Sequence, residues 1–503
     1  MVKQYYITTP IYYVNDKPHL GHAYTSVACD VLARFMRLDG RNVRFLTGTD
    51  EHGQKVEKSA ANAGMPPQEF TNEVSEHFRE MAKTLKLSND DFIRTTEQRH
   101  KDFAQGFWKK LVDAGDIYLG AYEGWYSVRD EAFYAESELI NGKAPTGANV
   151  EWVKEPSYFF KLSKFQEPLL KFYEENPDFI LPESRRNEVI SFVKGGLKDL
   201  SVSRTTFKWG IPVPGDEAHI MYVWLDALTN YCTAAGDMWP ADLHMVGKDI
   251  LRFHAVYWPA FLISAKMALP KRVFAHGWWT IEGEKMSKSL GNVVSPEHLV
   301  EKYGLDQTRY FLLREVPFGA DGNFSRESMA ERINADLANN IGNLAQRTLS
   351  MIAKHCDGKV PQPMRRSQDL ELLEKCHITK STSLEDAREA MQRCKFHEVL
   401  QAILAMSSAA NEFIDKEAPW TQKKISPVDM EATLYTLAEV IRCIGIMLQP
   451  FVPDSADKLL NQLAVPADKR SFEDLKPEYA LKAGTPLPKP EGVFPRILLE
   501  SAA

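Results

Sequence analysis

The sequence predicts an α/β protein in which a parallel sheet is interrupted by an α+β insertion and followed by a helical bundle. Strand-like and helix-like segments alternate near the N-terminus and again from about residue 242, which is typical of βαβ units. After about residue 325 helical patterns dominate and continue to about residue 463. These two patterns of predicted secondary structure favour one α/β part and one all-helical part.

The first βαβ unit is the clearest. Residues 4–9 are β-branched and aromatic and predict a strand, and a helical pattern runs from about His19 to Arg37. Asn42–Thr47 predicts a second strand, which ends in Gly48-Thr49-Asp50. Ligands of parallel sheets gather at the carboxyl ends of the strands. We therefore expect a ligand near the loops that follow these two strands.

From about residue 116 to 220, short aromatic segments are separated by Gly, Pro and Asn, which predicts the insertion. Residues 242–246 and 272–275 then predict strands on either side of a helix at about 249–266. The helical part is indicated by apolar or small residues at helical spacing, namely Ala330, Ile333, Leu337, Ile341, Leu344 and Thr348. Four prolines after residue 485 predict an extended tail.

The composition excludes several classes of protein. The chain of 503 residues has 44% hydrophobic and 26% charged residues, as ordinary globular proteins do. A net charge of −7 argues against a generic polyanion binder. The 6 cysteines form no Cys-x-x-Cys pair, which favours reduced thiols. The N-terminus does not resemble a signal peptide, and the longest apolar run, residues 255–265, is too short for a membrane span. We expect a cytoplasmic protein with no membrane partner.

The sharpest local motif is His19-Leu20-Gly21-His22 at a predicted strand-to-helix junction. A helix N-terminus presents unpaired N–H groups that suit a phosphate, and glycine lets a ligand approach the backbone. Two imidazoles three positions apart can both donate to phosphate oxygens. The alternative is an ordinary helix start with incidental histidines.

A second motif is Lys285-Met286-Ser287-Lys288-Ser289, flanked by Gly283 and Gly291. Two lysines with small hydroxyl residues between them can wrap a triphosphate, although a solvated basic loop is the alternative. The sequence has no Gly-x-x-x-x-Gly-Lys-Ser/Thr loop and no Gly-x-Gly-x-x-Gly. Together the two motifs favour a nucleotide site.

With these two motifs the sequence resembles the class I aminoacyl-tRNA synthetases, and most densely the methionyl-tRNA synthetases. The additional matching blocks are residues 9–13, 48–53, 222–228, 247–250, 339–344 and 418–420. The resemblance implies a Rossmann-like parallel-sheet catalytic domain split by a connective insertion, and an α-helical anticodon-binding bundle. It also implies ATP-dependent ligation of L-methionine to tRNA(Met), initiator tRNA included, through methionyl-adenylate, with release of AMP and diphosphate.

The resemblance divides the chain into six parts. They are the first half of the catalytic domain (1–115), the connective insertion (116–220), the second catalytic half (221–275), a stem-contact region (276–330), the anticodon-binding domain (331–465) and an extended tail (466–503).

The resemblance also implies residue roles in amino-acid binding. Asp50 would receive the α-ammonium of methionine, as one carboxylate at a strand end can. The walls of the methionine pocket would be Ile11, Tyr13, Trp224, Ala227, Leu228, Tyr231 and His254. Aromatic and aliphatic walls suit a thioether. Judged by residue type alone, Trp224, Tyr231 and His254 would be assigned to ordinary core packing.

ATP, accompanied by Mg²⁺ that the protein does not cage, would be bound by His19, Gly21, His22, Gly247, Asp249, Lys285, Lys288 and Val294. Of these, His19, His22, Lys285 and Lys288 would be catalytic. Asp249 could instead cap a helix. The anticodon would be bound by Asn343, Arg347 and Trp420, although a helix-capping contact is the alternative for Trp420.

The sequence departs from the family at the zinc knuckle that many members carry in the insertion. Tyr122–Tyr126 keeps the family pattern, but Ser127 and Asp130 replace the Cys-x-x-Cys pair, and residues 143–147 contain neither Cys nor His. Zinc requires such ligands, so we expect no structural zinc and no protein metal site. The chain ends soon after Phe494-Pro495-Arg496, without the dimerising domain of some relatives, and we expect a monomer.

Three alternatives differ in testable features. The first is another class I synthetase: the isoleucyl, valyl and leucyl enzymes carry large editing insertions that 503 residues cannot hold, and a cysteinyl enzyme needs zinc ligands that this sequence lacks. A smaller adenylyltransferase would lack the helical bundle and the lysine motif. A non-catalytic tRNA-binding relative would not need His19, His22, Lys285 and Lys288 intact.

Overall fold

The computed structural model describes residues 2–281, 284–285, 294–364, 366–376 and 382–498. Two compact units are present. The sheet unit comprises Gln4–Cys29 and Val43–His276, and the bundle unit comprises Met1–Lys3, Asp30–Asn42 and Gly277–Ala503. The six predicted parts are finer than this division, and their boundaries stay predictions.

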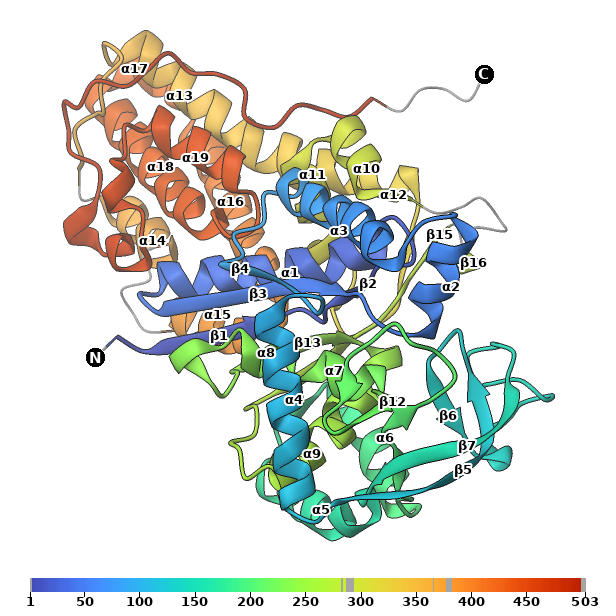
Figure 1. The fold of residues 1–503 in the computed structure, drawn as a ribbon. Helices are drawn as coiled ribbons and strands as arrows, with labels where there is room; N and C mark the ends of the chain where they lie inside the picture. The colour runs from blue at the N-terminus through green and yellow to red at the C-terminus, as the bar shows by residue number, and fades with distance from the viewer. Residues whose placement is uncertain (1, 282–283, 286–293, 365, 377–381, 499–503) are drawn as a thin grey trace. The chain divides into compact units, whose positions relative to one another are not determined.

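The sheet unit is built on a seven-stranded sheet with strand order β2-β3-β1-β13-β14-β8, and β4 lies beside β3 (Figure 1). The pairs β1–β13, β13–β14 and β3–β4 are parallel, which confirms the predicted parallel sheet. The strands are β1 (Gln4–Thr8), β2 (Tyr12–Tyr13), β3 (Asn42–Asp50), β4 (Asp91–Arg94), β8 (Ile180–Leu181), β13 (Leu243–Gly247) and β14 (Val273–His276).

The insertion contains a long antiparallel pair, β5 (Ile117–Ser127) with β7 (Glu151–Phe160) (Figure 1). These strands join a four-stranded sheet of order β6-β5-β7-β9. One strand of the predicted insertion has a different partner, because β8 pairs with β14 in the parallel sheet. Smaller elements of this region are β6 (Ala132–Tyr134), α5 (Gln166–Glu175), α6 (Glu183–Lys194), β9 (Leu200–Ser201), β10 (Ser203–Arg204), β11 (Pro212–Val213) and β12 (Asp216–Met221).

Two elements differ from their predicted form. β3 continues through Asp50 instead of stopping at Thr47. The helix predicted at 249–266 is three pieces: a 3-10 turn (Lys248–Ile250), the π-helical segment η5 (Phe253–Tyr257) and α9 (Trp258–Ser264). Pro259 has no N–H to donate to Ala255, whose carbonyl instead accepts from Tyr173 Oη (2.6 Å).

Further helices of the sheet unit cover or flank the sheet. They are α2 (Gln54–Asn62), α3 (Pro67–Thr84), α4 (Gln98–Asp113), α7 (Val223–Leu228) and α8 (Asn230–Thr233). The first residues of α1 (Leu20–Leu38) also belong to this unit, and the remainder of α1 belongs to the bundle unit.

The bundle unit confirms the predicted helical region. Its helices after α1 are α10 (Pro296–Tyr303), α11 (Leu305–Arg314), α12 (Arg326–Ile333), the π-helical η7 (Asn334–Gly342), α13 (Asn343–His355), α14 (Ser367–Cys376), α15 (Thr382–Gln392), α16 (Phe396–Glu417), α17 (Pro419–Ile425), α18 (Pro427–Leu448) and α19 (Pro453–Gln462). Helix α18 is buried from Ala432 to Leu448 and packs against α13, α16 and α19 (Figure 1).

The predicted helical stripe is buried, with Ala330, Ile333, Leu337, Ile341, Leu344 and Thr348 each no more than 1% exposed. The tail is extended over much of its length but also forms three short 3-10 turns between Ala467 and Tyr479. A small sheet pairs β15 (Trp279–Ile281) with β16 (Glu284–Lys285) and β17 (Gly322–Phe324). Among the described residues, no helix has the length and apolarity that a membrane span requires.

A buried arginine ties the bundle unit together. Arg309 on α11 is fully buried and donates to Asp30 on α1 (2.7 Å). Its guanidinium also donates to the carbonyls of Pro450 (2.9 Å) and Phe451 (3.0 Å), which follow α18. A buried charge is tolerated when it is paired and hydrogen-bonded in this way. Arg309 therefore fixes three segments against one another.

Replacement of Arg309 by methionine should lower the free energy of unfolding by about 3 kcal/mol, because Asp30 loses its buried partner. Urea unfolding followed by tryptophan fluorescence measures the loss. The matched variant is Arg34→Met, which removes a partly exposed partner of the same carboxylate and should cost less than about 1 kcal/mol. Equal losses in the two variants would contradict the role assigned to Arg309.

Candidate active site

The strand order of the sheet reverses at the pair β1 and β13, and the carboxyl ends of these two strands form the crevice edge. From β1 the sheet continues through β3 on one side, and from β13 through β14 on the other. The loops that leave β1 and β13 therefore diverge at their carboxyl ends, which is where ligands bind in open parallel sheets. The loop after β1 leads to His19, and β13 ends at Gly247.

His19 and His22 form a stacked pair where α1 begins. Their ring centroids lie 3.8 Å apart with an interplanar angle of 26°. Nδ1 of His22 accepts from the His19 backbone N–H (3.1 Å), and Nδ1 of His19 accepts from the Gly21 N–H (3.1 Å). Burial lowers the pKa of both rings. Both rings are thus neutral at neutral pH, with the proton on Nε2 available for donation.

Glycine at position 21 is required by the position of the His19 ring. A Cβ on Gly21 would lie 2.9 Å from His19 Cε1, closer than side chains tolerate. The turn is also held by Thr25, whose hydroxyl lies 3.1 Å from the Gly21 carbonyl and 2.7 Å from Nε2 of His276. His276 ends β14, so this contact joins α1 to a third strand of the crevice edge.

Gly247 and Asp249 lie at the same edge. A Cβ on Gly247 would lie 2.5 Å from Asp249 Oδ1, so the carboxylate folds back over the glycine. The charge of Asp249 raises the pKa of His19, against the larger effect of burial. A Cβ on Gly247 would also lie 3.8 Å from Cε1 of His276, the ring that contacts Thr25 of α1. Five of the predicted ATP-binding residues are thus brought together, namely His19, Gly21, His22, Gly247 and Asp249.

The remaining predicted ATP-binding residues belong to the bundle unit. Lys285 ends β16, where its backbone pairs with Thr280 of β15. Val294 precedes α10, and Lys288 lies outside the described residues. Their predicted contacts with ATP stay predictions.

Asp50 is a buried carboxylate at the end of β3, in parallel register with Tyr13. Its side chain is almost inaccessible, and the residue is 4% exposed. Burial raises its pKa well above the ordinary value, and the charges of Asp226 and Glu51 raise it further. A cation placed beside Asp50 would therefore be strongly favoured, because it would stabilise the ionised form.

The predicted pocket walls converge. Tyr231 Oη lies 2.7 Å from His254 Nε2, and His254 Nδ1 lies 2.9 Å from the Ile250 carbonyl. Burial lowers the pKa of His254 to about 4, so the ring is neutral: Nδ1 donates and Nε2 accepts from the tyrosine. Trp224 lies edge-on to His254, with ring centroids 6.0 Å apart.

The other predicted wall residues lie around the same core. Ile11, Tyr13 and Trp224 pack against the core that contains Leu228 and Tyr231. Ala227 is buried on α7 beside them in sequence.

Three buried polar atoms of these residues have no hydrogen-bond partner among the described residues: Tyr13 Oη, Trp224 Nε1 and Asp50 Oδ1. Such atoms are rare in native proteins because each costs free energy when buried unpaired. On residues predicted to form one pocket, these atoms are available to hydrogen-bond a small ligand that carries a cation and an apolar group.

The position of the family's zinc knuckle is closed by hydrogen bonds. Ser127 Oγ accepts from the Asp130 backbone N–H (3.2 Å), and Asp130 Oδ2 accepts from Tyr134 Oη (3.2 Å) and from the Thr146 hydroxyl. Arg129 donates to the Thr146 carbonyl (2.8 Å). These side chains do not fit zinc, and within the described ranges no cluster of His, Cys, Asp and Glu could hold a metal ion.

The predicted anticodon residues lie together in the bundle unit. Asn343 begins α13 and is exposed, and Arg347 lies one turn further along the same face. The Arg347 guanidinium lies over the Trp420 ring, 5.3 Å from its centroid, and also pairs with Asp415 (2.6 Å). Trp420 on α17 is 44% exposed, so one ring face is available to a ligand.

The sequence analysis missed several residues at this edge. Phe253 stacks flat on Trp224 (3.8 Å, 4°), and Thr25 and His276 hold the turn around Gly21. His276 ends β14, so the carboxyl-end rule could have indicated it. Phe253 carried no signal beyond its position next to His254.

Comparison with known proteins identifies the family. The sequence model described as "tRNA synthetases class I (M)" matches residues 5–151 and 136–349, and the "Anticodon binding domain of methionyl tRNA ligase" matches residues 365–503. The methionine–tRNA ligase of Rickettsia felis is 59% identical, over 99% of each chain. The chain belongs to the class I methionine–tRNA ligases.

Other members of the family agree. The methionine–tRNA ligase of Brucella suis is 57% identical over 98% of each chain. The Mycobacterium tuberculosis methionyl-tRNA synthetase in complex with methionyl-adenylate has a TM-score of 0.95 at 50% identity, over 98% of this chain and 100% of that one. The free-state structure of the Mycobacterium tuberculosis enzyme gives a TM-score of 0.89 at 47% identity, over 99% of each chain.

Purified protein should contain much less than one equivalent of zinc, because hydrogen bonds replace the metal ligands at the knuckle. Metal analysis by mass spectrometry measures this, and dialysis against a chelator should leave the melting temperature unchanged. Asp130→Ala should lower the melting temperature, since it removes the acceptor for Tyr134 and Thr146, whereas Glu123→Ala on exposed β5 should not. One bound equivalent of zinc would contradict the assignment.

Proposed function

We propose that this chain ligates L-methionine to tRNA(Met), initiator tRNA included, through methionyl-adenylate, with release of AMP and diphosphate. The observation that carries the proposal is the occurrence, at one edge of the sheet unit, of a stacked imidazole pair and a buried carboxylate whose Oδ1 has no partner among the described residues. The first suits phosphates and the second suits an α-ammonium group. An aminoacyl-adenylate requires both sites within one crevice.

In the first step the methionine carboxylate attacks the α-phosphate of ATP in line, and the α-phosphate to β-phosphate bond breaks to release pyrophosphate. Asp50 would hold the α-ammonium, and Tyr13 and Trp224 would contact the side chain. His19 and His22 would donate from Nε2 to the phosphates, and Lys285 and Lys288 would bind the leaving pyrophosphate. This is catalysis by positioning and by stabilisation of developing charge, without a protein nucleophile.

The adenosine would lie against Gly21 and Gly247, where a Cβ at either position would meet a neighbouring side chain. Asp249 could accept a hydrogen bond from a ribose hydroxyl, and Val294 would complete this site. Mg²⁺ bound to the ATP phosphates, rather than to a protein cage, would neutralise part of their charge.

In the second step a terminal ribose hydroxyl of the tRNA, the 2′-hydroxyl in class I, attacks the adenylate carbonyl and AMP leaves. Asn343 and Arg347 would hydrogen-bond anticodon base edges, and Trp420 would stack on an unstacked base. We further propose that the protein acts as a monomer in the cytoplasm and needs no zinc.

The activity test is ATP–pyrophosphate exchange with each of the twenty amino acids. Exchange should be fastest with methionine, because the pocket combines apolar and aromatic walls with a single carboxylate. Discrimination against homocysteine, which lacks only the methyl group of methionine and is assayed beside the twenty, should be modest, at about 10–200-fold. Fastest exchange with another amino acid, or no exchange with any, would contradict the proposed function.

The anticodon role is tested by Trp420→Ala. This variant should keep methionine-dependent exchange near the wild-type rate but reduce charging of tRNA(Met) by about tenfold, the loss expected for about 1.4 kcal/mol of base stacking. The control is Ile425→Ala on the same helix, which removes another exposed apolar side chain and should change neither rate. Equal loss of both activities in the Trp420 variant would argue against anticodon contact.

A further inference from the structure

A second carboxylate is buried directly beside Asp50. Glu51 is 0% exposed, and its charge raises the pKa of Asp50. Successive side chains at the end of a strand point to opposite faces, so Glu51 shares the face of Thr49 and Asp50 points the other way. A buried negative charge next to the group that must ionise for substrate binding needs a physical explanation.

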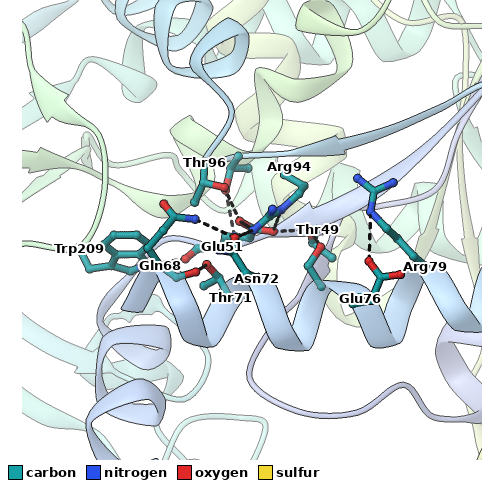
Figure 2. Close-up of polar contacts among 12 residues, drawn as sticks. Thr49, Glu51, Gln68, Thr71, Asn72, Glu76, Arg79, Arg94, Thr96 and Trp209 are labelled. Carbon is teal, nitrogen blue, oxygen red and sulfur yellow. Dashed lines mark hydrogen bonds and ion pairs between the residues drawn. The ribbon is translucent and has the colours of Figure 1, made fainter. Parts of the chain in front are cut away.

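Glu51 is fully hydrogen-bonded (Figure 2). Arg94 donates to both carboxylate oxygens, from Nε to Oε1 (2.6 Å) and from Nη2 to Oε2 (2.9 Å). The hydroxyls of Thr49 (2.7 Å) and Thr96 (2.5 Å) donate to the same carboxylate. Trp209 Nε1 donates to the Glu51 carbonyl (2.5 Å). Arg94 therefore supplies a positive charge directly against this carboxylate.

Arg94 is itself held in place. Its Nη2 donates to Asn72 Oδ1 (2.6 Å) on α3, and Gln68 Nε2 donates to the same oxygen (3.1 Å) (Figure 2). The guanidinium thus lies between the ends of β3 and β4 and helix α3. Such a bidentate arginine fixes both the geometry and the charge of its partner.

The other charged or titratable groups that face Asp50 come from α7, α2 and α8. Asp226 on α7 adds a second negative charge, which is paired with His52 and His100 at 2.7 Å each. Lys55 on α2 lowers the pKa of Asp50, and its Nζ lies 5.0 Å from the centre of the Tyr13 ring. Tyr231 on α8 is near enough for the Asp50 charge to raise its pKa. Of these two carboxylates, Glu51 is next to Asp50 in the chain, and Arg94 supplies the positive charge that compensates it.

We propose that Arg94, through its two hydrogen bonds to Glu51, is a positioning residue of the amino-acid site that keeps Asp50 able to receive the substrate's α-ammonium group. Without the guanidinium, Glu51 would be an uncompensated buried charge beside Asp50, and two neighbouring carboxylates resist joint ionisation. This inference rests on the proposed function and deepens it.

The test measures kcat/KM for methionine in ATP–pyrophosphate exchange between about pH 5 and 8, where an acid limb reports ionisation of the free enzyme. The variants are Arg94→Gln, Glu51→Gln and the double variant. The control is Arg79→Gln, because Arg79 is an arginine of α3 that pairs with Glu76 and lies away from Glu51 (Figure 2).

The two single variants should move the acid limb in opposite directions. Arg94→Gln removes the positive charge that faces Glu51, raises the pKa of Asp50 and should shift the limb to higher pH by about one unit. Glu51→Gln removes the like charge and should shift it to lower pH by a similar amount. The double variant removes both charges and should return toward the wild-type position, and Arg79→Gln should not move the limb. At the alkaline plateau kcat should stay within about twofold of wild type in every variant. At lower pH the effect of the variants should appear in the KM for methionine.

A merely structural role predicts something else, namely shifts of the same sign in both single variants, or a double variant worse than either. Either result would overturn the inference. Arg94→Lys provides a second reading if Arg94→Gln does not fold, because lysine keeps the charge and should hold the limb near its wild-type position. If the wild-type protein shows no methionine-dependent exchange, the proposed function is wrong. If it does, but the variants do not shift the acid limb, only the role of Arg94 is wrong.

Discussion

The pairing of β1 with β13 is the constraint on which the sheet unit depends. It joins Ile7 to Leu243 and Thr8 to His244, positions 236 apart, across the whole insertion. The two registered pairs are reinforced by side chains, since Asp242 accepts from the Tyr6 backbone N–H (2.8 Å) and Thr8 lies 2.8 Å from His244 Nδ1. Because this pairing creates the reversal of the strand order, it places the histidine turn and the loop after β13 at one edge.

Desolvation shifts the pKa values in the two halves of this edge in opposite directions. It disfavours the charged form of the histidines, and the ring nitrogens that face the backbone are saturated, which leaves two oriented donors. It also disfavours the charged form of Asp50, where no donor among the described residues reaches Oδ1, so a bound cation would stabilise the carboxylate. The same physical cause therefore prepares one part of the site for phosphate oxygens and the other for an ammonium group.

The sequence predicted the parts of this arrangement that depend on local pattern and on motifs. The parallel strands, the glycine at position 21 and the burial of the helical stripe from Ala330 to Thr348 are of this kind. Within the predicted helix at 249–266, Tyr173 donates to the Ala255 carbonyl the hydrogen bond that Pro259, which has no N–H, cannot supply. The Glu51–Arg94 pair joins residues 43 positions apart. Such partners are set by tertiary packing, which neither periodicity nor composition records.

The hydrogen-bonded turn of Ser127, Asp130 and Thr146 has a consequence for how the protein matures. A knuckle built on thiolates must acquire an ion before it is rigid, and oxidants that attack those thiolates can release the ion again. Here rigidity comes from a carboxylate and hydroxyl groups that no mild oxidant modifies. On the proposal that the protein needs no zinc, folding of the insertion would be independent of the supply of zinc in the cell.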